Sequence, residues 1–102
     1  RPVQEIWHND GDQVLAFSRK DLIFVFNFSH NRSFTDYGLL VPEGSYNIVL
    51  NTDAERFGGH ANVDETQTHF TMYDKLHARR KKGWLKLYIP ARTALVLKKN
   101  KE

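Results

Sequence analysis

Hydrophobic positions along this chain are concentrated in short segments, and in most of them apolar and polar residues alternate. Alternation with a period of two is typical of β-strands that have one buried face. Seven segments carry this pattern or a continuous apolar run of strand length, at residues 13–18, 22–28, 34–41, 46–50, 66–73, 84–89 and 93–97. Polar, glycine- or proline-containing turns separate most of them, and no segment has the apolar spacing of a helix. The pattern therefore predicts an all-β chain.

The segment Leu22–Phe28 is apolar on both of its faces. One face carries Leu22, Phe24, Phe26 and Phe28, and the other carries Ile23, Val25 and Asn27. Such a strand lies centrally in a sheet and is covered on both sides. Because a sandwich covers only one face of each of its sheets, the second apolar face indicates that another body packs against the outside of this domain.

The length of the chain limits the fold further. Its 102 residues are enough for one domain and too few for a (β/α)₈ barrel. About seven strands with turns every 8–12 residues predict an antiparallel β-sandwich of the Greek-key type, with a small closed barrel as the alternative. The sequence contains no cysteine, which excludes disulfide scaffolds and thiol nucleophiles and fits a reducing compartment such as the cytoplasm. No apolar run approaches the length of a membrane span, so we expect no membrane partner.

Charge is distributed unevenly between the two parts of the sequence. Residues 1–74 carry five Lys and Arg against eleven Asp and Glu, whereas residues 75–102 carry ten against one. The basic run Arg79–Lys82, with Trp84 and Tyr88 nearby, resembles a nucleic-acid surface. A solvated loop at a sheet edge has the same composition, and no second basic stripe accompanies the run. We therefore expect a solvated loop and keep nucleic-acid binding as an alternative.

The sequence carries no catalytic signature, and none of its serines lies in a nucleophile motif. Asp53 and Glu55 could form an acid–base pair, but they lie beside a turn in which Asp commonly binds the backbone. Asp64, Glu65 and His69 are close in sequence, yet their spacing matches no metal site. We expect no catalytic residue, no metal and no cofactor in this chain.

The segment 84–89 offers the best candidate for ligand binding. Its two faces carry Leu85, Leu87 and Ile89 on one side and Trp84, Lys86 and Tyr88 on the other. An exposed aromatic ring can cover the apolar face of a sugar, although most aromatic residues of a small β-domain belong to its core. We therefore take Trp84, Lys86 and Tyr88 as the candidate sugar-binding residues.

Several parts of the sequence resemble one known family. They are Val14–Phe28, Ser33–Tyr37, Val41–Tyr46, Leu50–His60, with its Phe-Gly-Gly-His loop, and Ile89–Leu97. In order and spacing they resemble the C-terminal all-β domain of 1,4-α-glucan branching enzymes, which belong to the α-amylase superfamily. The resemblance runs over residues 13–97 and is weakest over residues 65–83.

The resemblance implies that the catalytic carboxylates lie in a preceding (β/α)₈ barrel, so none of them maps onto this chain. The whole enzyme would cut an α-1,4-glucan and transfer the fragment to a 6-hydroxyl group, without a cofactor. Residues 1–12 would then be a connection from the barrel, and residues 13–102 a non-catalytic domain. That domain would pack on the barrel through Ile23, Val25 and Trp7 and, as in some relatives, contribute to binding of glucan chains.

Two other hypotheses make different predictions. A free-standing carbohydrate-binding module would have a polar outer face around Trp84 and no apolar patch, whereas a domain that packs on a barrel would expose a patch of more than a few hundred Å². A nucleic-acid binder that uses Arg79–Lys82 would lose affinity steeply with salt. Stacking of a glucan on an aromatic ring would respond little to salt.

Overall fold

The computed structural model describes residues 3–53 and 64–101, and within them the chain forms eight β-strands and one short 3₁₀ turn. The strands are β1 (Gln4–Asn9), β2 (Val14–Arg19), β3 (Leu22–Asn27), β4 (Phe34–Pro42), β5 (Ser45–Asn51), β6 (Thr68–Phe70), β7 (Lys82–Ile89) and β8 (Thr93–Lys99), and the turn η2 covers Ala78–Arg80. None of the helical structure in this described part is long and apolar enough to cross a membrane.

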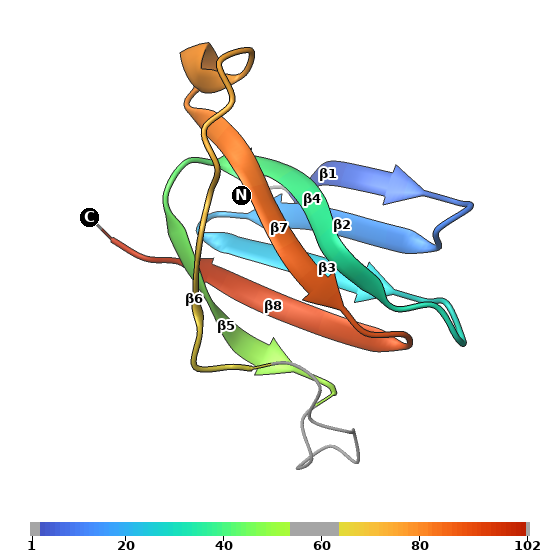
Figure 1. The fold of residues 1–102 in the computed structure, drawn as a ribbon. Helices are drawn as coiled ribbons and strands as arrows, with labels where there is room; N and C mark the ends of the chain where they lie inside the picture. The colour runs from blue at the N-terminus through green and yellow to red at the C-terminus, as the bar shows by residue number, and fades with distance from the viewer. Residues whose placement is uncertain (1–2, 54–63, 102) are drawn as a thin grey trace.

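The strands form two sheets that face each other (Figure 1). The larger sheet has the order β1-β2-β3-β8-β5-β6, and the smaller one pairs β4 with β7. All neighbouring strands are antiparallel. The chain crosses between the sheets after β3, β4, β6 and β7, and β8 returns to lie between β3 and β5. The prediction of an antiparallel sandwich is confirmed, and the closed barrel is excluded because the sheets are separate.

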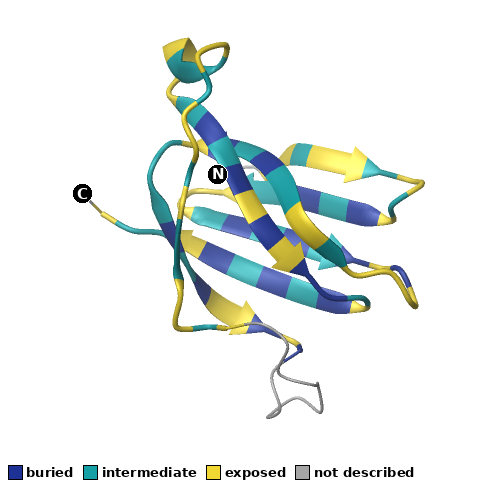
Figure 2. Ribbon diagram, in the orientation of Figure 1, coloured by how far each residue is buried: buried dark blue, intermediate teal, exposed yellow. Residues whose placement is uncertain are grey.

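The core lies between the two sheets, as the alternation of buried and exposed positions along the strands shows (Figure 2). Its members are Val14 and Ala16 of β2, Ile23 and Val25 of β3, Leu39 and Val41 of β4, Tyr46 and Ile48 of β5, Leu85, Leu87 and Ile89 of β7, and Leu95 and Leu97 of β8. Each of these strands therefore supplies alternate residues to one apolar layer. The predicted inner face of residues 84–89 is confirmed.

The strand β1 departs from the sequence prediction, which treats residues 1–12 as a connection. Gln4–Asn9 pairs with β2, and Ile6 packs against the core, so this segment belongs to the domain's own sheet. A register shift between Glu5 and Trp7 interrupts the alternation of the strand. That irregularity, in a strand whose apolar residues Ile6 and Trp7 are adjacent rather than alternating, explains why the period-two pattern does not mark this strand.

The end of β5 differs from the expected pattern for a similar reason. Alternation from Tyr46 and Ile48 predicts that Leu50 is buried, but Leu50 is exposed and Asn51 is buried. The pairing of β5 with β8 shifts register between Ile48 and Leu50. Because an inserted residue turns the following side chains to the opposite face, the shift moves Leu50 to the outside of the sandwich.

Candidate functional site

The outer surface of the larger sheet carries a continuous apolar patch, which we call the phenylalanine face. It consists of Leu15, Phe17, Phe24, Phe26, Phe28 and Val96. Five of these residues alternate with buried core residues along β2, β3 and β8, and Phe28 directly follows β3. The rings of Phe17 and Phe24 lie with their centroids 5.1 Å apart, and those of Phe26 and Phe28 lie 5.8 Å apart with planes 8° from parallel. Phe28, at 57% exposure, is the most open of the four phenylalanines. Among the described residues, the smaller sheet covers the opposite side of the larger sheet, where the core lies.

The position of this face corrects the prediction for Ile23 and Val25. Both side chains are buried in the core between the sheets, with 2% and 0% exposure, so neither can contact a neighbouring domain. The strand does have two apolar faces, and the one that carries Ile23 and Val25 is the inner one. The face open to another body is that of Phe24 and Phe26.

Trp7 lies at the edge of the larger sheet, on β1. Its Nε1 donates a hydrogen bond of 2.7 Å to the hydroxyl of Tyr37 on β4, and that hydroxyl donates to a carboxylate oxygen of Asp12 at 3.1 Å. Burial raises the pKa of Tyr37 above its usual value, which keeps this hydroxyl protonated and able to donate. The indole of Trp7 therefore links the two sheets at one edge of the sandwich.

The outer surface of the smaller sheet carries the three candidate glucan-binding residues. Trp84, Lys86 and Tyr88 alternate along β7 with the buried leucines, so all three lie on its outer side as the sequence predicts. A Cβ atom added to Gly38, on the neighbouring strand β4, would lie 3.4 Å from Cε3 of Trp84. The indole therefore lies directly against the backbone of β4 at a position that carries no side chain.

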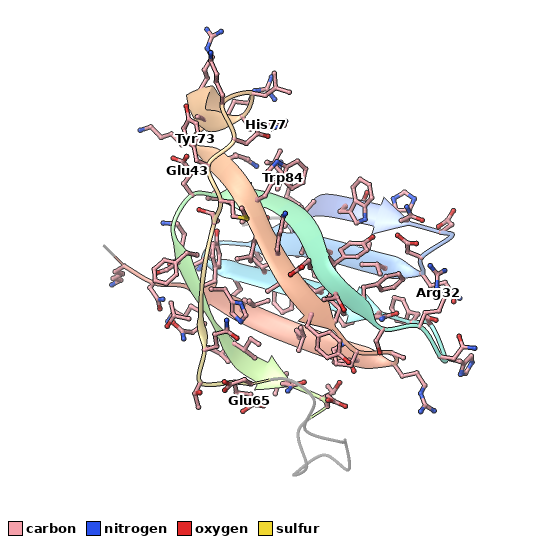
Figure 3. The ribbon with its side chains drawn as sticks, in the orientation of Figure 1. Arg32, Glu43, Glu65, Tyr73, His77 and Trp84 are labelled. Carbon is pink, nitrogen blue, oxygen red and sulfur yellow. The ribbon has the colours of Figure 1, made fainter. Side chains whose placement is uncertain are left out.

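Two polar residues hold the indole of Trp84 in place (Figure 3). Its Nε1 donates a hydrogen bond of 2.7 Å to Oδ2 of Asp74, and the ring of His77 meets it edge-on with centroids 5.7 Å apart. Nδ1 of His77 lies 2.6 Å from the same Oδ2. The hydrogen bond from His77, with those from Trp84 and the amide of Leu76, lowers the pKa of Asp74 below its usual value. An ionised carboxylate thus orients the aromatic ring.

The segment 71–83, which we call the arm, projects beyond the ends of both sheets (Figure 1). Its two sides are joined by backbone hydrogen bonds between Met72 and Trp84, of 2.7 and 3.0 Å, and it ends in the turn η2. The predicted basic loop Arg79–Lys82 lies at this end, where Arg79, Arg80 and Lys81 are exposed. Sequence reasoning missed Asp74, although an Asp three residues before a His was a local signal for the turn.

The candidate carboxylates do not form a site in the described residues. Asp53 is buried next to Asn51, whose side-chain oxygen accepts a hydrogen bond from the Asp53 amide at 2.8 Å, and Glu55 lies outside the described residues. The carboxylate of Asp64 caps a turn by accepting from the amide and hydroxyl of Thr66. Burial lowers the pKa of His69, the histidine of the same candidate metal group, below its usual value. Within the described ranges, no three His, Asp or Glu side chains gather as a metal site.

Comparison with known proteins places this chain in a family. Residues 6–100 match the family described as "Alpha amylase, C-terminal all-beta domain". The chain is 43% identical over 93 residues, or 90% of its length, to the 1,4-alpha-glucan-branching enzyme of Eremothecium gossypii, 48% over 87 residues (84%) to that of Candida glabrata, and 45% over 94 residues (90%) to that of Dictyostelium discoideum. It spans only 12–13% of the length of these relatives. The chain belongs to the family of α-amylase C-terminal all-β domains.

Proposed function

We propose that this chain is the non-catalytic C-terminal domain of a 1,4-α-glucan branching enzyme, which transfers segments of α-1,4-glucan to form α-1,6 branches during glycogen biosynthesis. About 90% of the chain aligns with such enzymes, and residues 6–100 match a family of C-terminal all-β domains, which supports this role. The sequence has no cysteine, which fits a cytoplasmic enzyme. The reaction itself would belong to a catalytic barrel elsewhere in the parent protein, and this domain would support that barrel.

The observation that carries the supporting role is the phenylalanine face. Monomeric domains rarely leave a large contiguous apolar surface in water, and stacked aromatic rings at the centre of such a surface are typical of permanent interfaces. The rings of Phe17, Phe24, Phe26 and Phe28 form such a surface on the outside of the larger sheet. This surface favours a domain that packs on a barrel over a free-standing carbohydrate-binding module, which would not need it.

A chimeric enzyme tests the packing role. The C-terminal domain of the Eremothecium gossypii branching enzyme is replaced by this chain, which is 43% identical to it, and soluble yield and branching activity are measured. We expect an active chimera, and we expect Phe26→Asn/Phe28→Asn to lower both quantities by about tenfold, because polar groups would be buried without partners. Tyr73→Asn, which alters an exposed aromatic residue of the arm, is the control. Equal losses in both variants would reject the phenylalanine face as the interface.

The second part of the proposal is that the outer face of β7 binds a glucan chain. Trp84 is held by Asp74, His77 and the bare backbone at Gly38, and Tyr88 is exposed two positions beyond Lys86 on the same side. An aromatic ring fixed before binding loses little conformational entropy when a sugar stacks on it. The amine of Lys86 could donate hydrogen bonds to sugar hydroxyl groups.

Electrophoresis of this chain in native gels with and without glycogen tests glucan binding. We expect glycogen to slow the chain to the same degree at low and moderate salt, and we expect Trp84→Ala to abolish the slowing. Trp7→Ala serves as the matched control, because Trp7 lies on β1 at the far edge of the larger sheet. Unchanged mobility of the wild-type chain would assign glucan binding to other parts of the parent enzyme.

A further inference from the structure

The arm exposes more large apolar side chains than its size explains. Met72, Tyr73 and Leu76 of the arm are exposed, as is Phe70, the last residue of β6. Tyr73 and Leu76 keep 74% and 79% of their surface in water. These four residues lie within seven consecutive positions of the sequence. They are also of types that anchor protein–protein interfaces, particularly the tyrosine and the methionine.

The arm holds these residues in a fixed geometry. Asp74 accepts hydrogen bonds through its side chain from Leu76, His77 and Trp84, and its backbone carbonyl accepts from the amides of His77 and Ala78. The hydrogen-bonded pair of Met72 and Trp84 closes the base of the arm. The exposed apolar side chains therefore stand on a preorganised support, which reduces the entropic cost of binding a partner.

Positive charge surrounds the apolar residues. Lys75, Arg79, Arg80, Lys81 and Lys82 all lie in the arm, and Asp74 is its one carboxylate. In the described part of the chain, neither Arg79 nor Arg80 forms an ion pair. These two arginines and Leu76 line an open hollow of about 490 Å³. A hollow between two guanidinium groups and a leucine fits a carboxylate beside an apolar side chain.

We propose that the arm is a docking site for an acidic peptide segment of another protein, in which carboxylates flank an apolar side chain. The apolar side chain enters the hollow against Leu76, and the carboxylates bind Arg79 and Arg80. The charge complementarity and the lining of the hollow identify this class of partner. Its contact residues, Leu76, Arg79 and Arg80, differ from those of the proposed glucan and barrel surfaces, so the proposal can be tested independently of them.

Other ligands match only part of this surface. A glucan chain is uncharged and would leave the five cations of the arm without a role. A single-stranded nucleic acid would use the cations and Tyr73, but Leu76 offers no flat ring on which a base could stack. An anionic bilayer would attract the arginines, but its surface is flat and would leave the hollow between Leu76, Arg79 and Arg80 unused. An acidic peptide with an apolar anchor uses both features.

Fluorescence anisotropy of labelled probes tests the proposal with this chain. The probes are a short synthetic peptide in which glutamates alternate with leucine and phenylalanine, a polyglutamate with the same number of glutamates, and a single-stranded oligothymidine. Cosedimentation with vesicles of anionic phospholipid is measured in parallel. We expect the mixed peptide to bind about tenfold more tightly than polyglutamate, because the apolar anchor adds to the ionic contacts.

Variants assign the binding to the arm. Leu76→Ala should lower the affinity for the mixed peptide to that for polyglutamate, and Arg79→Glu/Arg80→Glu should abolish binding of both peptides. Lys98→Glu/Lys101→Glu changes the net charge by the same amount at exposed positions outside the arm, and it should leave binding nearly unchanged. All of these side chains are exposed, so the variants should retain the fold.

The following results would overturn the proposal. Equal affinity for the two peptides would leave only nonspecific ionic attraction, and equal losses in the two double variants would attribute the binding to net charge. Tighter binding of oligothymidine than of the mixed peptide would make the arm a nucleic-acid surface. Binding to vesicles without binding to the peptide would make it a membrane contact.

Discussion

At the scale of single residues, Asn27 ties together three parts of the backbone at one end of the sandwich. Its side-chain nitrogen donates to the carbonyls of Arg32, Ile89 and Pro90 at 2.9–3.2 Å, and its side-chain oxygen accepts from the amide of Ser29 at 3.0 Å. The side chain is almost completely buried. The sequence places Asn27 on the same face of the strand as Ile23 and Val25 but assigns that face to the barrel, whereas the side chain is buried inside the domain. Its partners come from segments that the sequence does not bring together.

Replacing this side chain should be costly. In Asn27→Ala, buried carbonyls and an amide lose their hydrogen-bond partner, and we expect the free energy of unfolding to fall by about 2–3 kcal/mol. Urea denaturation followed by far-ultraviolet circular dichroism measures the change. Asn31→Ala, in the exposed loop after β3, is the control and should change stability by less than about 0.5 kcal/mol. Similar losses in the two variants would contradict the role given to Asn27.

Asp74 gives a pH-dependent prediction. Because hydrogen bonds from His77 and Trp84 lower its pKa below the usual 3.8, its stabilising contribution is complete above that value. It is lost as the pH falls through the lower pKa of the folded chain. In a Trp7→Phe background, which leaves Trp84 as the one indole, we expect a fluorescence transition with its midpoint below pH 3.8.

The Asp74→Asn variant in the same background should lack this transition and should show altered Trp84 emission already at neutral pH. Asp10→Asn, whose carboxylate side chain is 99% exposed, is the control and should retain the transition. An unchanged acid transition in Asp74→Asn would show that another group causes it.

The position of Trp84 on the outer face of β7 could be predicted from alternation in the sequence, but its contact with Asp74 depends on the conformation of the arm.

At the scale of elements, the two sides of the arm approach each other very closely at Gly83. A Cβ atom at this position would lie 2.8 Å from the carbonyl oxygen of Met72 and 3.1 Å from Cβ of Thr71. The obstacle is backbone, so it cannot rotate away as a flexible side chain can. Glycine is therefore needed here for close packing of two chain segments.

The variant Gly83→Ala should push the two sides of the arm apart. We expect it to weaken the pairing of Met72 with Trp84 by about 1–2 kcal/mol, which raises the open population roughly 5–30-fold. Trypsin cleavage within Arg79–Lys82 should accelerate accordingly. Gly38→Ala, whose added carbon would meet only the ring of Trp84 at an ordinary distance, should leave the cleavage rate nearly unchanged. Equal rates in the two variants would argue against tight packing at Gly83.

The elements that the sequence predicts well are those with uninterrupted patterns. Residues 84–89 alternate cleanly and form a strand with the expected inner face. Residues 22–28 are a continuous apolar run, and Leu22–Asn27 forms the expected strand, but its inner face is the one that the sequence assigns to the barrel. The strand β1 and the end of β5 contain register shifts, which break the period of two. The expected strand at residues 66–73 is reduced to Thr68–Phe70, because the chain then leaves the sheet to build the arm.

At the scale of the whole molecule, the phenylalanine face leaves one side of the sandwich apolar. The rings stack on one another, which shields part of each, but Phe28 remains largely open to water. In the proposed parent enzyme the barrel would cover this surface. In the separate chain, the same surface should bind a second apolar surface, including that of another copy.

Self-association of the chain should therefore depend on these rings. In sedimentation velocity, we expect the average mass of the wild-type chain to rise with concentration, and we expect Phe26→Asn/Phe28→Asn to remain monomeric at about tenfold higher concentration. Met72→Asn/Tyr73→Asn removes two exposed apolar residues from the arm and should associate like the wild type. If Met72→Asn/Tyr73→Asn remained monomeric while Phe26→Asn/Phe28→Asn associated like the wild type, the self-associating surface would lie on the arm.

The central position of β8 has a consequence for how the domain folds. This strand is the second hydrogen-bonded neighbour of both β3 and β5, although it comes after both of them in the chain. A hairpin of β2 and β3 can form early, but the larger sheet is joined only when β8 inserts between strands from distant parts of the sequence. Such nonlocal pairing makes folding slow. In a chain cut before Thr93, the larger sheet would fall into two fragments, β1-β2-β3 and β5-β6, each with a newly open edge that can pair with other molecules.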